Sequence, residues 1–226
     1  MTALDNHAIF GAARAFRPRF SLAPLASAIA LIAVVVVLSA ILMRGFSENG
    51  LRLGSQWAWR YTFFIFFAAM VAEPVGRLAA RFTSFIWPES LDRKLIWGFC
   101  ASYGVYLLSV FLPNVIRLSG GAILMVLFGT TVAVVMALTA GPIKRQSGNQ
   151  GGKPLIGERT RRAILGIAMI YFWSCYSLMA LARISGPHRP DTFYDISLSL
   201  MLAALFVRFA ARWFRPHSAE QCLKAA

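Results

Sequence analysis

The stretch LAPLASAIALIAVVVVLSAILM, residues 22–43, carries no charged side chain and decides the class of fold. A helix needs about 20 consecutive apolar residues to cross a hydrocarbon core that is roughly 30 Å thick. Residues 22–43 meet this requirement, and they exceed the apolar core of about 7–15 residues that is typical of a cleavable signal peptide. We therefore expect a membrane-spanning helix that is retained as a signal anchor.

Five further apolar stretches follow this first one. They occupy residues 57–78, 95–112, 120–140, 163–181 and 193–214. Because lipid offers no hydrogen bonds to the backbone, such stretches are expected to be helices, whereas a membrane β-barrel shows alternating segments of about ten residues. The sequence thus predicts an all-α polytopic membrane protein, a six-helix bundle over residues 22–214. Tails at 1–21 and 215–226 and a polar linker at 141–162 complete the chain.

The composition supports a membrane protein and excludes other classes. Hydrophobic residues make up 58% of the chain and charged residues 14%, yet the formal net charge is +14. A disordered chain has low hydrophobicity, and a soluble nucleic-acid-binding domain does not need this much apolar surface. We therefore predict no nucleic-acid partner. The positive charge is expected to face the anionic headgroups of the bilayer.

The positions of the basic residues predict the orientation of the bundle. Most of the 23 Lys and Arg residues lie in the N-terminal tail, in the connections within 77–94 and 141–162, and in the segment 208–224. These segments all fall on one side of a six-span chain. Since cytoplasmic loops are enriched in Lys and Arg, we predict a bacterial inner-membrane protein with both termini in the cytoplasm.

Polar side chains in or near the spans are the candidate functional positions, because charges are costly inside a bilayer. They are Arg60, Glu73, Arg77, Tyr103, Asp195 and Arg208. One hypothesis is an anion or quinone site formed by Arg60 and Asp195 on the periplasmic side. A second combines Glu73, Arg77 and Arg208 on the cytoplasmic side, where the first two are four residues apart and can pair. The alternative is that these charges anchor the helices at the interfaces, since a long Arg side chain reaches the headgroups from within a span.

Small and aromatic residues in the spans have a packing interpretation. Gly98, Gly104, Gly129 and Gly166 are predicted to let neighbouring helices approach closely. Aromatic residues deep in the spans, Tyr103 among them, are expected either to pack the helices together or to line a cofactor or quinone cavity.

Three motifs resemble the ferric-reductase-like transmembrane domain family, which includes the haem-bearing membrane subunit of periplasmic methionine sulfoxide reductase systems. They are EPVGRL at 73–78, RKLIWGFCASY at 93–103, and GERTRR at 157–162 leading into a helix with Tyr171-Phe172-Trp173. The resemblance implies a six-helix bundle with cytoplasmic termini, as the apolar pattern also predicts.

The sequence departs from this family at the haem ligands. The family binds b-type haem through pairs of His on facing helices, and one His is expected about four residues after the Tyr at 103. This chain has Leu107 there, and its histidines are His7, His188 and His217, none within a predicted span. The resemblance therefore implies a member that has lost its haems, with Met ligation as an open alternative.

No motif for catalysis, metal binding or nucleotide binding is present, so the sequence predicts no catalytic residue and no cofactor, with quinone as an open alternative. The first functional hypothesis is a non-catalytic membrane subunit or scaffold that contacts a membrane protein partner. The alternatives are an electron-transfer or quinone-interacting protein and a small transporter or lipid-interacting protein.

Overall fold

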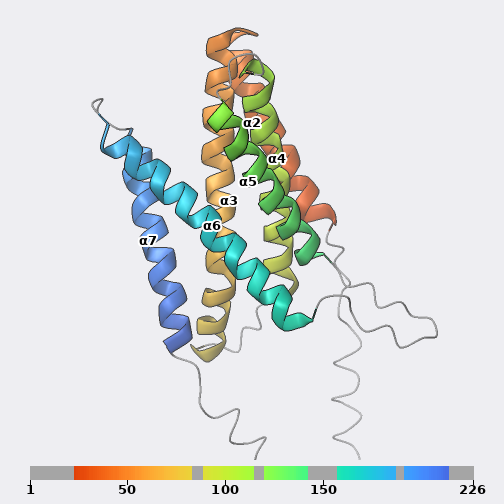
Figure 1. Ribbon diagram of the computed structural model, residues 1–226, viewed down its shortest axis with the longest axis vertical. Helices are drawn as coiled ribbons and strands as arrows, with labels where there is room; N and C mark the ends of the chain where they lie inside the picture. The colour runs from red at the N-terminus through yellow and green to blue at the C-terminus, as the bar shows by residue number, and fades with distance from the viewer. Residues whose placement is uncertain (1–22, 83–88, 115–119, 142–156, 187–190, 214–226) are drawn as a thin grey trace, which may run out of the picture.

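The protein is built from antiparallel helices. The computed structural model describes residues 23–82, 89–114, 120–141, 157–186 and 191–213, and no strand occurs among them. The helices are α2 (Ala23–Arg44), α3 (Glu48–Phe82), α4 (Glu89–Asn114), α5 (Gly120–Ala140), α6 (Glu158–Ile184) and α7 (Thr192–Trp213). Consecutive helices run in opposite directions (Figure 1). The all-α prediction is confirmed for these residues. The predicted tails and most of the linker at 141–162 lie outside them.

Five helices are long and apolar enough to cross a membrane. They are α2, α3, α4, α6 and α7. In α5 the apolar stretch Val126–Ala140 is shorter. The chain is therefore a multi-pass integral membrane protein, while the count of six spans and the orientation of the bundle stay predictions.

The turn between α2 and α3 explains why α3 begins nine residues before its apolar stretch at 57. Gly45 has a φ of 72°, a left-handed conformation that suits glycine. The hydroxyl of Ser47 then accepts a hydrogen bond from the backbone N–H of Gly50 at 3.2 Å, which caps the first turn of α3. At its other end α3 continues through Pro74. The polar segment before residue 57 is thus helical because it is capped, although its composition gives no membrane signal.

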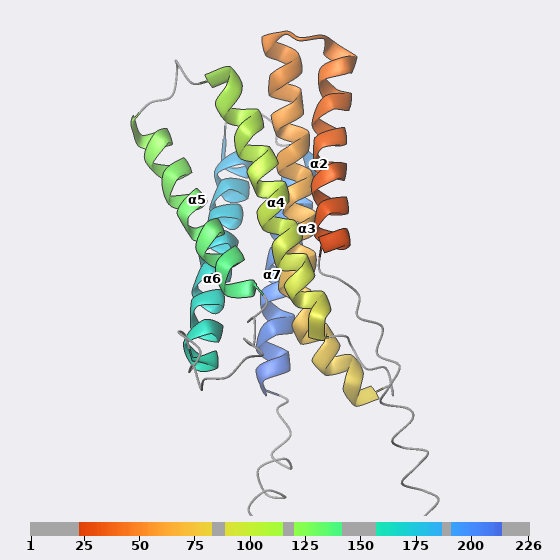
Figure 2. The ribbon, with the colours of Figure 1, turned by 90° about the vertical axis from the view of Figure 1, so that its right-hand side faces the viewer.

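The helices form two neighbouring groups that share α3 and α4. α2 packs against α3 and α4, α7 packs against α3 and α6, and α5 packs against α4 and α6 (Figure 2). We call the end with the α2–α3 turn the hairpin end. The opposite end, where α3, α5 and α7 finish and α6 begins, is called the basic end because Arg77, Arg161 and Arg208 lie toward it.

Glycines mark two close approaches between helices. A Cβ atom on Gly98 of α4 would overlap the side chain of Ile29 on α2, and one on Gly129 of α5 would lie 2.5 Å from the Tyr103 hydroxyl on α4. For Gly98 and Gly129 the predicted close packing is confirmed. For Gly104 and Gly166 it is wrong, since a Cβ there would meet nothing within 4 Å in the described part of the chain.

Polar groups of α5 are satisfied locally. The hydroxyls of Thr130, Thr131 and Thr139 each donate to the carbonyl four residues earlier, at 2.7–2.8 Å. The last carbonyls of α5 are capped by Arg161 of α6, which is 6% exposed and donates to the carbonyls of Thr139 and Gly141. Arg161, which the sequence pattern assigns to the orientation signal and to the GERTRR motif, therefore also joins the ends of two helices.

Candidate functional site

Aromatic rings fill the centre of the bundle. We define the aromatic core as Trp59, Phe63 and Phe66 of α3, Phe99, Tyr103 and Tyr106 of α4, and Phe172 and Tyr176 of α6. The Trp59 ring centroid lies 4.3 Å from that of Tyr176 and 5.3 Å from that of Tyr106. The Phe66 ring stacks on Tyr176 at 5.3 Å with an angle of 21° between the planes. These large rings carry the contact between α3 and α6.

Tyr103 occupies the α4 side of this core. Its ring lies 5.1 Å from Phe172, 5.8 Å from Phe99 and 5.9 Å from Tyr106 between centroids. Its hydroxyl points to the backbone of α5 at Gly129, where a Cβ would be 2.5 Å away. The Tyr103 side chain is therefore in contact with residues of α4, α5 and α6. Of the two interpretations of the deep aromatics, its position favours helix packing.

Two hydroxyl groups in α6 are buried without a hydrogen-bond partner in the described part of the chain. They belong to Tyr176 and Ser177. Tyr176 is 3% exposed and is surrounded by rings of the aromatic core. A buried hydroxyl without a partner costs stability, so this part of the core is the place where a small polar ligand or water would be favoured.

Arg60 is paired near the hairpin end with a residue that the predicted site does not include. Its guanidinium forms a salt bridge with Asp191, and the side chains are 35% and 47% exposed. Arg60 also lies over the ring of Phe193, 4.9 Å from the centroid. Asp195, the second residue of the predicted site, lies one turn further along α7 and is exposed. Arg60 therefore contacts the start of α7, and the anion or quinone site of Arg60 and Asp195 stays a prediction.

Asp191 has a second role that explains this arrangement. Its carboxylate accepts a hydrogen bond from the backbone N–H of Phe193 at 3.3 Å, and so caps α7 at its first turn. A carboxylate fixed at a helix start is well placed to receive a neighbouring guanidinium. An Asp immediately before an apolar helical stretch is a known capping signal, and it would have identified this residue from the sequence.

The second group of candidate residues is only partly assembled. Arg77 and Glu73 form the salt bridge expected from their spacing on α3, with exposed side chains on both partners. Their charges therefore compensate each other at the surface of the helix. Arg208 lies on a different helix, α7, where it borders a cavity. The structure thus divides the predicted cytoplasmic site into a surface ion pair and a separate Arg-lined cavity.

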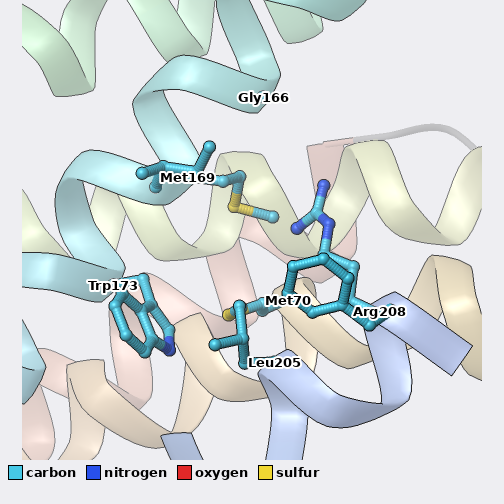
Figure 3. Close-up of a pocket in the computed structure, with 8 residues that line it drawn as sticks. Met70, Gly166, Met169, Trp173, Leu205 and Arg208 are labelled. Atoms are coloured by element: carbon cyan, nitrogen blue, oxygen red, sulfur yellow. The ribbon is translucent and has the colours of Figure 1, made fainter. Parts of the chain in front are cut away.

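This cavity lies between α3, α6 and α7 and has a volume of about 290 Å³. It is lined by Met70, Gly166, Met169, Ile170, Trp173, Leu205, Arg208 and Phe209. Figure 3 shows the guanidinium of Arg208 beside the side chain of Met169, with Trp173 and Leu205 lower in the view. The walls are therefore apolar except for one cation. Among the lining residues, the sequence pattern identifies only Arg208 as a candidate functional position.

Metal ligands do not gather in the described helices. Within that part of the chain, no group of three or more His, Cys, Asp or Glu residues is placed to hold a metal ion. The three histidines, at positions 7, 188 and 217, lie outside the described residues. The absence of a resident metal or haem remains a prediction.

No family model, curated protein or solved structure matches this chain. The resemblance to the ferric-reductase-like domain is therefore still a prediction. What the protein does has to be inferred from its own residues.

Proposed function

We propose that this integral membrane protein is a non-catalytic subunit or scaffold whose bundle resembles the ferric-reductase-like domain without holding haem. One observation carries the proposal: aromatic side chains occupy the centre of the bundle. Phe66, Phe99 and Phe172 are each at most 2% exposed and contact one another at centroid distances of 4.9–6.1 Å. A haem placed between α3, α4 and α6 would need the space that these rings fill.

The position expected for a haem ligand supports the same proposal. Leu107, which stands where the resemblance expects a His, packs against the aromatic core. An aliphatic side chain offers no lone pair to iron, and haem proteins of this type hold the iron by axial imidazoles. In this proposal, the loss of the ligand and the filling of the space belong together, because an empty haem pocket would forfeit packing contacts.

An absorption spectrum of the purified full-length protein tests the absence of haem. We expect the absorption band of the aromatic side chains in the near ultraviolet and no Soret band, with iron far below one atom per chain. A Soret band with stoichiometric iron would refute the proposal. Expression with added haem precursor serves as the control, because it removes limited haem supply as a reason for an empty protein.

The subunit role needs its own test. Membranes are solubilised in a mild detergent, and the mass of the protein component of the particle is measured by light scattering. A subunit is expected in a particle with more protein than the 24.9 kDa of one chain, together with a second polypeptide. A particle that holds one chain and no other protein contradicts this role.

One observation favours a second candidate, an electron-transfer or quinone-interacting protein. The Trp59 ring contacts those of both Tyr106 and Tyr176, so oxidisable side chains are in contact across three helices. Redox-difference spectra and quinone extraction from the purified protein distinguish the candidates. A bound chromophore or quinone at one per chain would favour electron transfer over the scaffold.

A further inference from the structure

The cavity between α3, α6 and α7 exists because α6 lacks a side chain where its neighbours leave room. A Cβ atom on Gly166 would meet nothing within 4 Å among the described residues. The glycine therefore does not serve a close helix contact. In a membrane helix, where Gly usually permits close packing, a glycine that faces open space leaves a recess in the surface.

The walls of this recess are held in a fixed arrangement. The indole N–H of Trp173 on α6 donates a hydrogen bond to the backbone carbonyl of Met201 on α7, at 3.0 Å. This bond joins the two helices on one side of the cavity. Met169 of α6 and Met70 of α3 are buried and also line the cavity. A preformed cavity of this kind binds a ligand without the cost of ordering its walls.

The cavity volume and its lining limit the class of ligand. At about 290 Å³, it is close to the lower limit of roughly 300 Å³ that is usual for small-molecule sites. Its lining is apolar apart from Arg208. A ligand that fits both features has a flexible hydrocarbon part and one anionic group.

The depth of Arg208 matches that of a lipid headgroup. It lies five residues before the end of α7 at Trp213, which corresponds to about 7.5 Å along the helix axis. Trp213 is 89% exposed, as expected for an aromatic side chain at the membrane interface. The guanidinium of Arg208 is therefore within reach of the boundary between acyl chains and headgroups.

We propose that this cavity binds one anionic phospholipid, with part of an acyl chain along the apolar walls and the phosphate group on Arg208. A guanidinium is suited to phosphate because its planar N–H groups donate two parallel hydrogen bonds. The proposal is independent of the scaffold role.

Native mass spectrometry of the full-length protein tests this site. The purified protein is mixed with equal amounts of phosphatidylglycerol and phosphatidylcholine that carry identical acyl chains. We expect one phosphatidylglycerol to be retained in preference to phosphatidylcholine. Arg208→Gln should weaken phosphatidylglycerol binding about tenfold and abolish the preference, as expected for the loss of a charge-assisted hydrogen bond. Arg162→Gln, an exposed arginine at the basic end that does not line the cavity, should bind as the unaltered protein does.

A second pair of variants tests the cavity itself without changing a charge. Gly166→Leu places a side chain in the recess and should reduce retention of both lipids. Gly104→Leu is the matched control, since Gly104 is also a helical glycine with nothing within 4 Å of its Cβ position but lies on α4, away from the cavity. It should leave lipid binding unchanged.

The proposal is overturned if Arg208→Gln and Gly166→Leu retain phosphatidylglycerol as the unaltered protein does. It is also overturned if extraction yields a quinone at one per chain that Gly166→Leu removes, because the cavity is then a quinone site. If Gly166→Leu does not assemble, judged by circular dichroism and elution volume, the comparison of Arg208→Gln with Arg162→Gln still decides the outcome.

Discussion

Replacing Gly129 by alanine should destabilise the bundle through a single atomic overlap with the Tyr103 hydroxyl. The new Cβ would lie 2.5 Å from that oxygen, a separation well inside van der Waals contact. The oxygen cannot move away easily, because the Tyr103 ring is enclosed by Phe99, Tyr106 and Phe172. Overpacking of this kind costs about 1–3 kcal/mol.

A second effect of the substitution has the opposite sign. Alanine is more favourable than glycine within a helix by about 1 kcal/mol. The net loss of stability for Gly129→Ala is therefore expected to lie between roughly zero and 2 kcal/mol. A measurement on this variant alone would not separate the two effects.

Removal of the hydroxyl separates them. In a Tyr103→Phe background the atoms nearest to the new Cβ are the ring Cζ at 3.6 Å and the Tyr171 hydroxyl at 3.7 Å, which are ordinary contact distances. Gly129→Ala should then keep only its gain in helix propensity. Because this gain is the same in both backgrounds, the double-mutant cycle should give a coupling of about 1–3 kcal/mol.

The assay is reversible unfolding in mixed micelles with a rising fraction of sodium dodecyl sulfate, followed by tryptophan fluorescence and circular dichroism. Gly104→Ala is the control, since its Cβ meets nothing within 4 Å and only the propensity gain is expected. A coupling within about 0.5 kcal/mol of zero, the range in which independent substitutions add, would refute the proposed contact between α4 and α5.

Three further predictions concern the start of α7, the contact between α6 and α7, and the membrane topology. Asp191→Asn should lower the free energy of unfolding by less than about 1 kcal/mol, because it removes an exposed ion pair with Arg60 but keeps the cap of α7. Asp191→Ala also removes the cap and should cost about 1 kcal/mol more in the same titration. Equal effects of the two variants would contradict the capping role. Trp173→Phe should lower stability by about 1 kcal/mol through loss of the hydrogen bond to α7, measured against the unaltered protein. Reporter fusions at Gly148 and His188 should report opposite sides of the membrane, cytoplasmic and periplasmic respectively; signals from one side only would overturn the predicted topology.

The helices could be predicted from the sequence because their signal is local. A run such as residues 22–43 is apolar throughout, and the length of the run alone matches a bilayer. The ends were harder to predict, since a capped helix can begin well before its apolar stretch. The start of α3 at Glu48 depends on the Ser47 cap and the Gly45 turn, and both residues lie outside the apolar stretches.

Long-range pairs were not accessible in the same way. Arg60 and Asp191 are 131 residues apart, and their contact depends on how α3 and α7 rotate against each other. The sequence singled out Arg60 and grouped it with Asp195 by depth, but it did not single out Asp191. By contrast, Glu73 and Arg77 could be paired from their spacing, because a single helix fixes both positions.

Gly129 and Gly166 show why a glycine in a membrane helix does not reveal its purpose. Each lies in a largely apolar helix and predicts a close approach from the sequence. In the bundle, Gly129 faces the hydroxyl of a ring locked in the aromatic core, whereas Gly166 faces a recess. A glycine leaves an unfilled space at the helix surface, and the packing of the neighbouring helices determines what occupies that space. At Gly129 the space is filled by Tyr103, so a larger residue should weaken the fold. At Gly166 no neighbouring side chain fills it, so a larger residue should leave the fold intact and displace a lipid. The opposite responses of these two positions to enlargement therefore separate a packing glycine from one that forms a binding site.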